Sequence, residues 1–168
     1  DEPMILDDIV AQKRTDLAQI RTQVSVEALE QRPLYQHPRR SLYDALTAVP
    51  RAIIAEIKRA SPSRGMIRAA CDPVQIAAQY ATNGATAISV LTETNYFKGS
   101  LDDLAAVRQQ VQVPLLRIDF IFDPYQVYEA RAYGADAMLL IVAMLDDVQL
   151  RDLSALAREL TLLSLIHI

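Results

Sequence analysis

The 168-residue chain has a single cysteine, Cys71, and no long apolar run. One cysteine excludes an internal disulfide framework and any multi-cysteine metal site, and it suits a reducing compartment, so we expect a cytoplasmic protein. No apolar segment approaches the roughly 18 residues of a membrane span, and we expect neither a membrane anchor nor a signal peptide. The sequence also has no Walker loop, dinucleotide-binding glycine fingerprint or serine-hydrolase elbow.

An excess of positive charge is missing as well, since the formal net charge is −4 and the pI is near 5.1. This balance offers no long-range attraction for nucleic acid or an anionic membrane, so we expect a small-molecule partner. His37 and His167 lie far apart without metal-ligand spacing, and we expect no metal. A hydrophobic content of 51% with 23% charged residues excludes disorder and supports a folded, globular core.

Residues 1–50 are expected to form an N-terminal helical extension. From about residue 3, the apolar residues Leu6, Ile9, Leu17 and Ile20 fall at helical spacing among polar neighbours. A second, short helix is predicted to begin at Ser41, where a serine precedes an acidic residue by three positions in the manner of a capping box.

From residue 51 the pattern changes to short apolar runs that alternate with amphipathic segments. Aspartate followed by proline at 72–73 and 123–124, and Ser100, mark helix starts, while Gly84 and Gly134 mark helix ends. The predicted strands are residues 52–58, 87–93, 115–120 and 137–143, and the predicted helices are residues 73–83, 101–111, 124–133 and 146–160. This alternation predicts four consecutive βα units in an α/β fold.

Repeated βα units favour a parallel sheet, which either a doubly wound sheet or a (β/α)8 TIM barrel provides. Strand spacings of roughly 22–35 residues, multiplied by eight, come close to the ~250 residues typical of a barrel. We therefore expect a (β/α)8 TIM-barrel type of fold in which residues 51–161 supply about the first four βα units.

The most informative segment is residues 53–65, IIAEIKRASPSRG. Residues two apart on a strand share a face, so Glu56 and Lys58 point the same way near the carboxyl end of the strand, where barrels place their active sites. The alternatives are a structural Glu–Lys pair or an edge strand with a solvated face. The polar, glycine-ended loop that follows is suited to an anion and favours a functional site.

At this segment the sequence resembles the indole-3-glycerol phosphate synthase family. Residues 55–65 are similar to the family signature, with Arg64 where lysine is common. Further similar blocks follow in the same order at residues 92–93, 96–100, 119–121, 123–126, 129–131, 134–137 and 145–147. Several ordered blocks are more specific than any single motif, and the resemblance extends over about residues 3–161.

The resemblance implies a carboxy-lyase of tryptophan biosynthesis. The reaction is the decarboxylating ring closure of 1-(2-carboxyphenylamino)-1-deoxyribulose 5-phosphate, and it requires no cofactor or metal. Glu56 and Lys58 would be catalytic, with Lys58 on the substrate carboxylate or carbonyl and Glu56 tuning it. The residues implied to bind the phosphosugar substrate are Ser61, Pro62, Phe97, Phe120 and Leu139, although plain core packing is an equally good explanation of the apolar ones.

Two features depart from the family pattern. Ile118 occupies the position of the family's general-acid lysine, through either divergence or a single-base misreading, and losing a positioned acid costs about 10²–10⁴-fold in rate. Residues 162–168 are expected to be a tail outside the family pattern, because they lack the acidic residue of the family's fifth strand and residues 163–168 match one frame of a common sequencing-adapter end. The prediction is thus a fragment truncated after the fourth βα unit, inactive on its own, with open half-barrel edges that favour self-association.

Two alternatives remain open at this stage. One is another phosphosugar barrel enzyme, such as a phosphoribosylanthranilate isomerase, which would require different acid and base residues at the strand ends. The other is a non-catalytic half-barrel module that binds a phosphorylated ligand or a partner, which Ile118 would permit.

Overall fold

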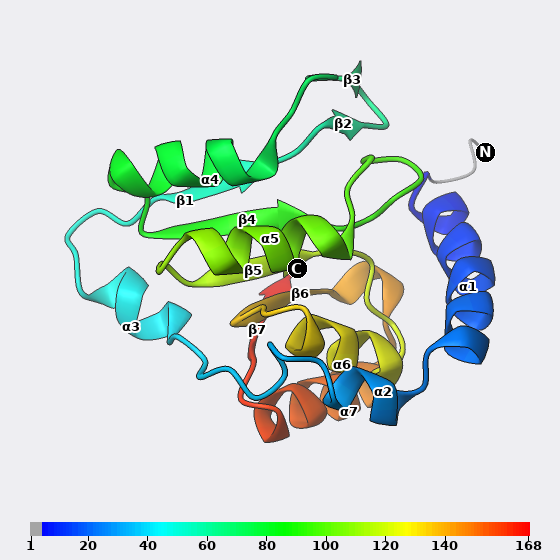
Figure 1. The fold of residues 1–168 in the computed structure, drawn as a ribbon. Helices are drawn as coiled ribbons and strands as arrows, with labels where there is room; N and C mark the ends of the chain where they lie inside the picture. Colours follow the sequence, from blue (N-terminus) through cyan, green and yellow to red (C-terminus); the bar gives the residue numbers. More distant parts are fainter. Residues whose placement is uncertain (1–4) are drawn as a thin grey trace.

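A computed structural model describes residues 5–168 (Figure 1). Its centre is a five-stranded parallel sheet in which the strand order follows the chain order, β1-β4-β5-β6-β7. The strands are β1 (Ile54–Ile57), β4 (Ala87–Leu91), β5 (Leu115–Ile118), β6 (Ala137–Ile141) and β7 (Leu163–His167). A doubly wound sheet reverses its strand order at a switch point, whereas barrel strands follow one another. The barrel-type prediction is confirmed, and the doubly wound alternative is wrong.

Four helices connect the five strands, so the predicted four βα units are confirmed. They are α4 (Pro73–Thr82), α5 (Leu101–Gln110), α6 (Pro124–Ala132) and α7 (Asp147–Glu159). The predicted caps are present, because the side chains of Asp72, Ser100 and Asp123 each accept a hydrogen bond from a backbone N–H in the first turn. Gly84 and Gly134 follow α4 and α6 with φ angles of +93° and +92°, as expected for residues that end a helix.

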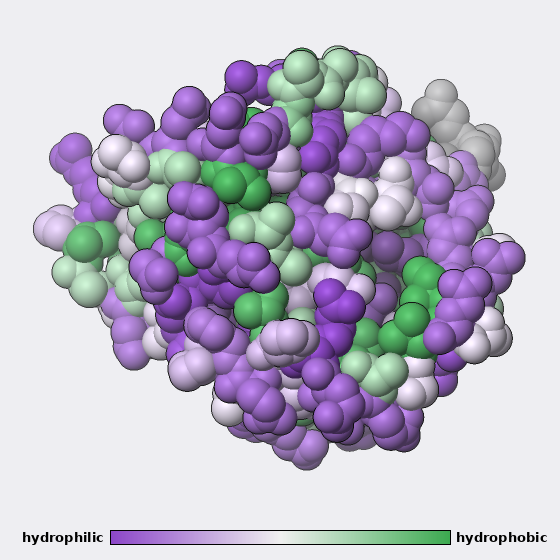
Figure 2. All heavy atoms as spheres, in the orientation of Figure 1, coloured by the Kyte–Doolittle hydropathy of each residue, from purple (hydrophilic) through white to green (hydrophobic). Residues whose placement is uncertain are grey.

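The main core lies between the sheet and these four helices. Alternate strand positions point into it, and each fully buried aliphatic side chain contributes about 1.5–3 kcal/mol of hydrophobic free energy. Its strand residues include Ile57, Val90, Leu115, Met138 and Leu140, and its helix residues include Ala77, Leu104, Val127 and Leu153. Outside the core, the face drawn in Figure 2 is largely hydrophilic, with apolar side chains in small groups.

The N-terminal extension forms three helices, α1 (Ile5–Gln23), α2 (Val26–Glu30) and α3 (Leu42–Thr47). Residues 1–4 of the predicted extension lie outside the described residues. Ser41 caps α3 as predicted, and Leu42 packs on Ala87, Leu116 and Ala137 near the beginnings of three strands. In Figure 1, α1 lies on the opposite side of the sheet from α3, beyond the ends of the strands. The extension therefore covers both ends of the sheet.

Four short elements were not predicted. They are α2, the hairpin of β2 (Ala60–Ser61) and β3 (Gly65–Met66) after β1, and a 3-10 helix η1 (Val142–Met144) after β6. The expected tail contains β7. The segment predicted as a strand over residues 52–58 pairs only from Ile54, opposite Ala87 of β4.

The two edge strands, β1 and β7, each pair with one neighbour in the described part of the chain. Both carry exposed apolar side chains, among them Ile54 on β1 and Leu165 and Ile166 on β7.

Candidate active site

An open cleft of about 920 Å³ lies at the carboxyl end of β1. It is walled by the first turns of α1, by the end of β1 and its hairpin, and by the loops after β4 and β5. The lining residues that matter for the chemistry are Glu56, Lys58, Ser61, Pro62, Arg64, Arg68, Phe97 and Phe120. Six of the predicted site residues thus meet in one cleft, at the end of the sheet where barrels place their sites.

Glu56 and Lys58 form an ion pair in this cleft, with 3.0 Å between Lys58 Nζ and Glu56 Oε2. Their side chains are 42% and 33% exposed, so both charges reach the solvent-filled space. The residue between them, Ile57, points the other way and is buried in the main core. The strand alternation therefore presents the pair to the cleft, as predicted from the spacing.

The hairpin supplies the polar wall of the cleft. Ser61 is buried, and its Oγ accepts a hydrogen bond from the Arg64 N–H at 3.3 Å, which helps to shape the turn. Arg64 and Arg68 line the cleft beside Lys58, whereas the neighbouring Arg59 turns away to an ion pair with Asp103 of α5. Among residues 5–168, three cationic side chains thus face the cleft against one carboxylate, that of Glu56, and their charge suits an anionic ligand.

Phe97 and Phe120 form the apolar wall, with 5.9 Å between ring centroids and 39° between ring planes. Leu139 and Ile118 do not line the cleft. Leu139 lies on β6, half-buried and opposite Leu165 of β7. Ile118, half-buried at the end of β5, packs against the cluster formed by Leu42 and the strand starts.

The loop that carries Phe97 is held by Glu93. Its buried carboxylate accepts hydrogen bonds from three backbone N–H groups, of Asn95 at 2.7 Å, Tyr96 at 2.7 Å and Phe97 at 2.9 Å. Gly99 closes the loop, because a Cβ at that position would lie 2.0 Å from the Leu91 carbonyl oxygen. These contacts fix the position of the Phe97 backbone at the edge of the cleft.

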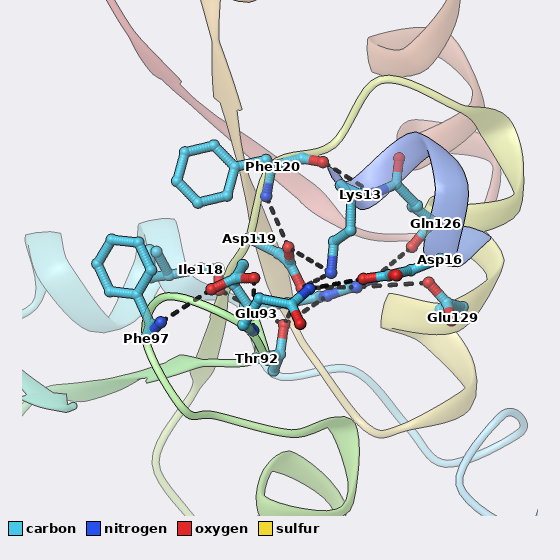
Figure 3. Close-up of polar contacts among 12 residues, drawn as sticks. Lys13, Asp16, Thr92, Glu93, Phe97, Ile118, Asp119, Phe120, Gln126 and Glu129 are labelled. Atoms are coloured by element: carbon cyan, nitrogen blue, oxygen red, sulfur yellow. Dashed lines mark hydrogen bonds and ion pairs between the residues drawn. The ribbon is translucent and has the colours of Figure 1, made fainter. Parts of the chain in front are cut away.

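The loop after β5 is held by a buried charge network (Figure 3). The Asp119 carboxylate accepts hydrogen bonds from Thr92 Oγ1 at 2.6 Å, from Arg117 Nη2 at 3.1 Å and from the Phe120 N–H at 2.8 Å. Lys13 of α1 lies 2.9 Å from Asp119 Oδ1. Glu129 of α6 completes the network through Arg117, at 3.4 Å. The network ties α1, β5 and α6 together next to the Phe120 backbone.

Within this network the pKa values of the two carboxyl groups shift in opposite directions. Burial alone would raise the pKa of Asp119, but the charges of Lys13 and Arg117 outweigh it and lower this pKa from 3.8 to about 2. Burial dominates at Glu129 and raises its pKa despite the neighbouring Arg117. Asp119 is therefore the fixed anion that holds both cations.

No site role was predicted from the sequence for Lys13, Thr92, Glu93, Arg117, Asp119 or Glu129. A signal was present for two of them, because Arg117 and Asp119 repeat the pattern of opposite charges two residues apart that identified Glu56 and Lys58. Lys13 had no such signal in the sequence, because its contact with Asp119 depends on how α1 packs against the end of β5.

Two features are absent from the described part of the chain, residues 5–168. No group of three or more histidine, cysteine, aspartate or glutamate residues is arranged to hold a metal ion. None of the helices there combines the length and the apolar character that crossing a membrane requires.

Comparison with known proteins gives one consistent result. The sequence profile of the family described as indole-3-glycerol phosphate synthase matches residues 6–168. Proteins of that name from Arthrobacter sp. (strain FB24), Salinibacter ruber (strain DSM 13855 / M31) and Dehalococcoides mccartyi (strain CBDB1) are 50%, 48% and 46% identical to the chain. The matches cover 97%, 98% and 98% of the chain, and 62%, 62% and 65% of the relatives.

The chain thus spans less than two thirds of the length of these relatives. The family profile nevertheless covers nearly all of it, and the match includes β7 as well as the cleft residues. The chain belongs to the indole-3-glycerol phosphate synthase family.

Proposed function

We propose that this chain carries the substrate-binding end of an indole-3-glycerol phosphate synthase. The observation that supports it most directly is the Glu56–Lys58 pair, 3.0 Å apart and presented to a 920 Å³ cleft. The proposed substrate is 1-(2-carboxyphenylamino)-1-deoxyribulose 5-phosphate, and the proposal includes the cytoplasmic location and the tryptophan-pathway role of the family.

The two walls of the cleft match the two chemical halves of that substrate. Phe97 and Phe120 offer an apolar surface on which the carboxyphenyl ring can pack. Lys58, Arg64 and Arg68 offer positive charge to the carboxylate or phosphate, and guanidinium groups bind such anions bidentately. Ser61 and Pro62 would lie between these regions.

The reaction needs a cation near the reacting atoms. Ring closure joins the ring carbon that carries the carboxylate to the ketone carbon, and the ketone oxygen takes up a proton. CO₂ then leaves, and the electrons of the broken C–C bond return to the ring and restore its aromaticity. The new hydroxyl leaves as water together with a proton from the adjacent carbon, which forms the indole double bond. Lys58 would stabilise the negative charge that develops on the ketone oxygen, and Glu56 would orient its ammonium group.

With Ile118, this chain lacks a proton donor at the family's general-acid position. An isoleucine cannot donate a proton, and the nearby Lys13 ammonium is already held by Asp119. We propose that turnover is slow for this reason, since a positioned general acid contributes about 10²–10⁴-fold. The same observation favours a second candidate function, in which the chain binds the phosphorylated ligand without turning it over. The proposal also includes self-association through the exposed edges β1 and β7.

Fluorescence detection of indole-3-glycerol phosphate tests the proposal. The chain would be assayed alone and joined to the C-terminal segment of the Arthrobacter relative, each with Ile118 and with Ile118→Lys. We expect the joined Ile118→Lys protein to turn over at least about tenfold faster than its Ile118 parent, and Lys58→Met to abolish that activity. Failure of the lysine to raise turnover would refute the role of position 118. Binding of substrate without product from any protein would favour the second candidate.

A further inference from the structure

A second, separate pocket opens at the opposite end of the sheet from the cleft. It has a volume of about 290 Å³, close to the lower limit of ~300 Å³ for small-molecule sites. Its walls come from the residues before and in α3, the last turn of α7 and the start of β7. They include Arg39, Arg40, Ser41, Tyr43, Asp136, Arg158 and Thr161.

Positive charge in this pocket exceeds negative charge. Among residues 5–168, Arg39, Arg40 and Arg158 line it together with one carboxylate, that of Asp136. Asp136 is already engaged, because Oδ2 accepts hydrogen bonds from Arg108 Nη1 at 2.6 Å and from the Leu115 N–H at 2.8 Å, while Oδ1 accepts from the Arg40 backbone N–H at 2.7 Å. No hydrogen bond within residues 5–168 joins Asp136 to the guanidinium group of Arg39 or Arg40.

No ion pair to any of the three arginine side chains is found within residues 5–168. In this part of the chain, Arg39 donates to the backbone carbonyl oxygens of Leu34, His37 and Ala135. Burial lowers the pKa of Arg39 to about 10, and the neighbouring charge of Arg131 adds to this effect.

The other two guanidinium groups have donors to spare. Arg40 donates to the Gln112 side chain through Nη2, while its buried Nη1 meets no acceptor in the described part of the chain. Arg158 is exposed, and no ion pair to it is found among residues 5–168.

We propose that this pocket binds a small phosphate dianion, either free or as a phosphomonoester. Arg40 and Arg158 would donate to its oxygens, and Arg39 would add the charge of a fixed cation behind them. The Ser41 hydroxyl, whose oxygen accepts the Asp44 N–H at 3.1 Å, keeps its proton for the same ligand. Bound there, the dianion joins the segment before α3 to the last turn of α7, so ligand binding stabilises the packing of the N-terminal extension against the start of the sheet.

The test uses the intact chain and inorganic phosphate as the probe. Melting temperature would be followed as phosphate is added, against sodium chloride at equal ionic strength, and Kd would be measured by titration calorimetry. We expect a saturable rise with phosphate alone, and Kd about tenfold weaker for each guanidinium removed in Arg40→Gln and Arg158→Gln. Arg151→Gln is the matched control, since Arg151 is an exposed arginine on the same helix that lies outside the pocket.

Lys58→Gln separates this pocket from the basic wall of the cleft. The proposal requires the Lys58→Gln chain to keep a saturable rise in melting temperature with phosphate, and it requires Arg158→Gln in that background to weaken the phosphate affinity. It is overturned if Lys58→Gln abolishes the effect while Arg40→Gln and Arg158→Gln retain it, or if sodium chloride raises the melting temperature equally. If Arg40→Gln fails to fold, the test depends on Arg158→Gln, because Arg158 is exposed. Unchanged phosphate affinity in that variant overturns the proposal.

Discussion

The buried network around Asp119 predicts a large and pH-dependent effect of Asp119→Asn, which keeps the side-chain shape and removes its charge. Asp119 is fully buried and contacts both Lys13 and Arg117. Removing one partner of a buried ion pair costs about 3–5 kcal/mol, because the remaining charges stay buried without compensation. At 2–4 °C per kcal/mol for a domain of this size, we expect the melting temperature at pH 7 to fall by roughly 6–20 °C.

The destabilisation by Asp119→Asn should become smaller at low pH, as the pKa values of Asp119 and Glu129 show. The Asp119 pKa is about 2 in the folded chain and 3.8 ordinarily, so its contribution is complete above pH 3.8 and is lost as the pH falls towards 2. The gap corresponds to roughly 2 kcal/mol. The raised pKa of Glu129 acts in the opposite direction, because its protonation at low pH relieves a cost of burial. Both proteins retain Glu129, but the Asp119 charge is one cause of its raised pKa, so Asp119→Asn also relieves part of that rise.

Urea unfolding at pH values from 7 to 2.5 would measure this difference. Asp123→Asn is the matched control, since Asp123 pairs with the exposed Arg21 and an asparagine can still cap α6, so its cost should stay within about 1 kcal/mol at every pH. Parallel stability curves for the parent chain and Asp119→Asn across this range would refute the reasoning.

Two further predictions concern the loop after β4 and the sheet edge. Gly99→Ala should destabilise the chain by about 3 kcal/mol in urea unfolding, because its Cβ would meet the Leu91 carbonyl oxygen, and it should weaken ligand binding by displacing Phe97; an unchanged unfolding free energy would contradict this. Size-exclusion chromatography should show the parent chain as an oligomer, and Leu165→Lys on the exposed edge β7 should shift it towards monomer; a parent chain that runs as a compact monomer would contradict this.

The fold was predictable because its signals are local. The caps at Asp72, Ser100 and Asp123 lie within three residues of the groups they bind, and the strand runs are continuous in sequence. The β2–β3 hairpin was missed because its strands have only two residues each, which is too short for any periodic pattern. The expectation that residues 162–168 are a tail outside the family pattern was based on sequence alone, and the structure places most of them in β7.

The site was predictable only in part for the same physical reason. Glu56 and Lys58 stand two residues apart, so strand geometry alone places them on one face. Lys13 and Asp119 are 106 positions apart, and no local pattern reports a contact that depends on how α1 packs on the end of the sheet. The basic pocket at the other end draws on Arg39, Arg40 and Arg158, which likewise come together only in the folded chain.

Successive side chains of β5 point to opposite faces of the sheet, so the residue that stabilises the fold and the residue at the proposed general-acid position lie on different faces. Arg117 points towards α6 and binds the Gln126 carbonyl oxygen and Glu129, while its neighbour Ile118 points to the other face, towards Leu42 and Leu116. A substitution at position 118 therefore leaves the network of Arg117, Asp119 and Lys13 intact. An isoleucine there adds apolar contact on the inner face and removes no hydrogen bond of the network, so it does not lower the free energy of unfolding. For this reason Ile118→Lys should change turnover in the joined protein far more than it changes the free energy of unfolding.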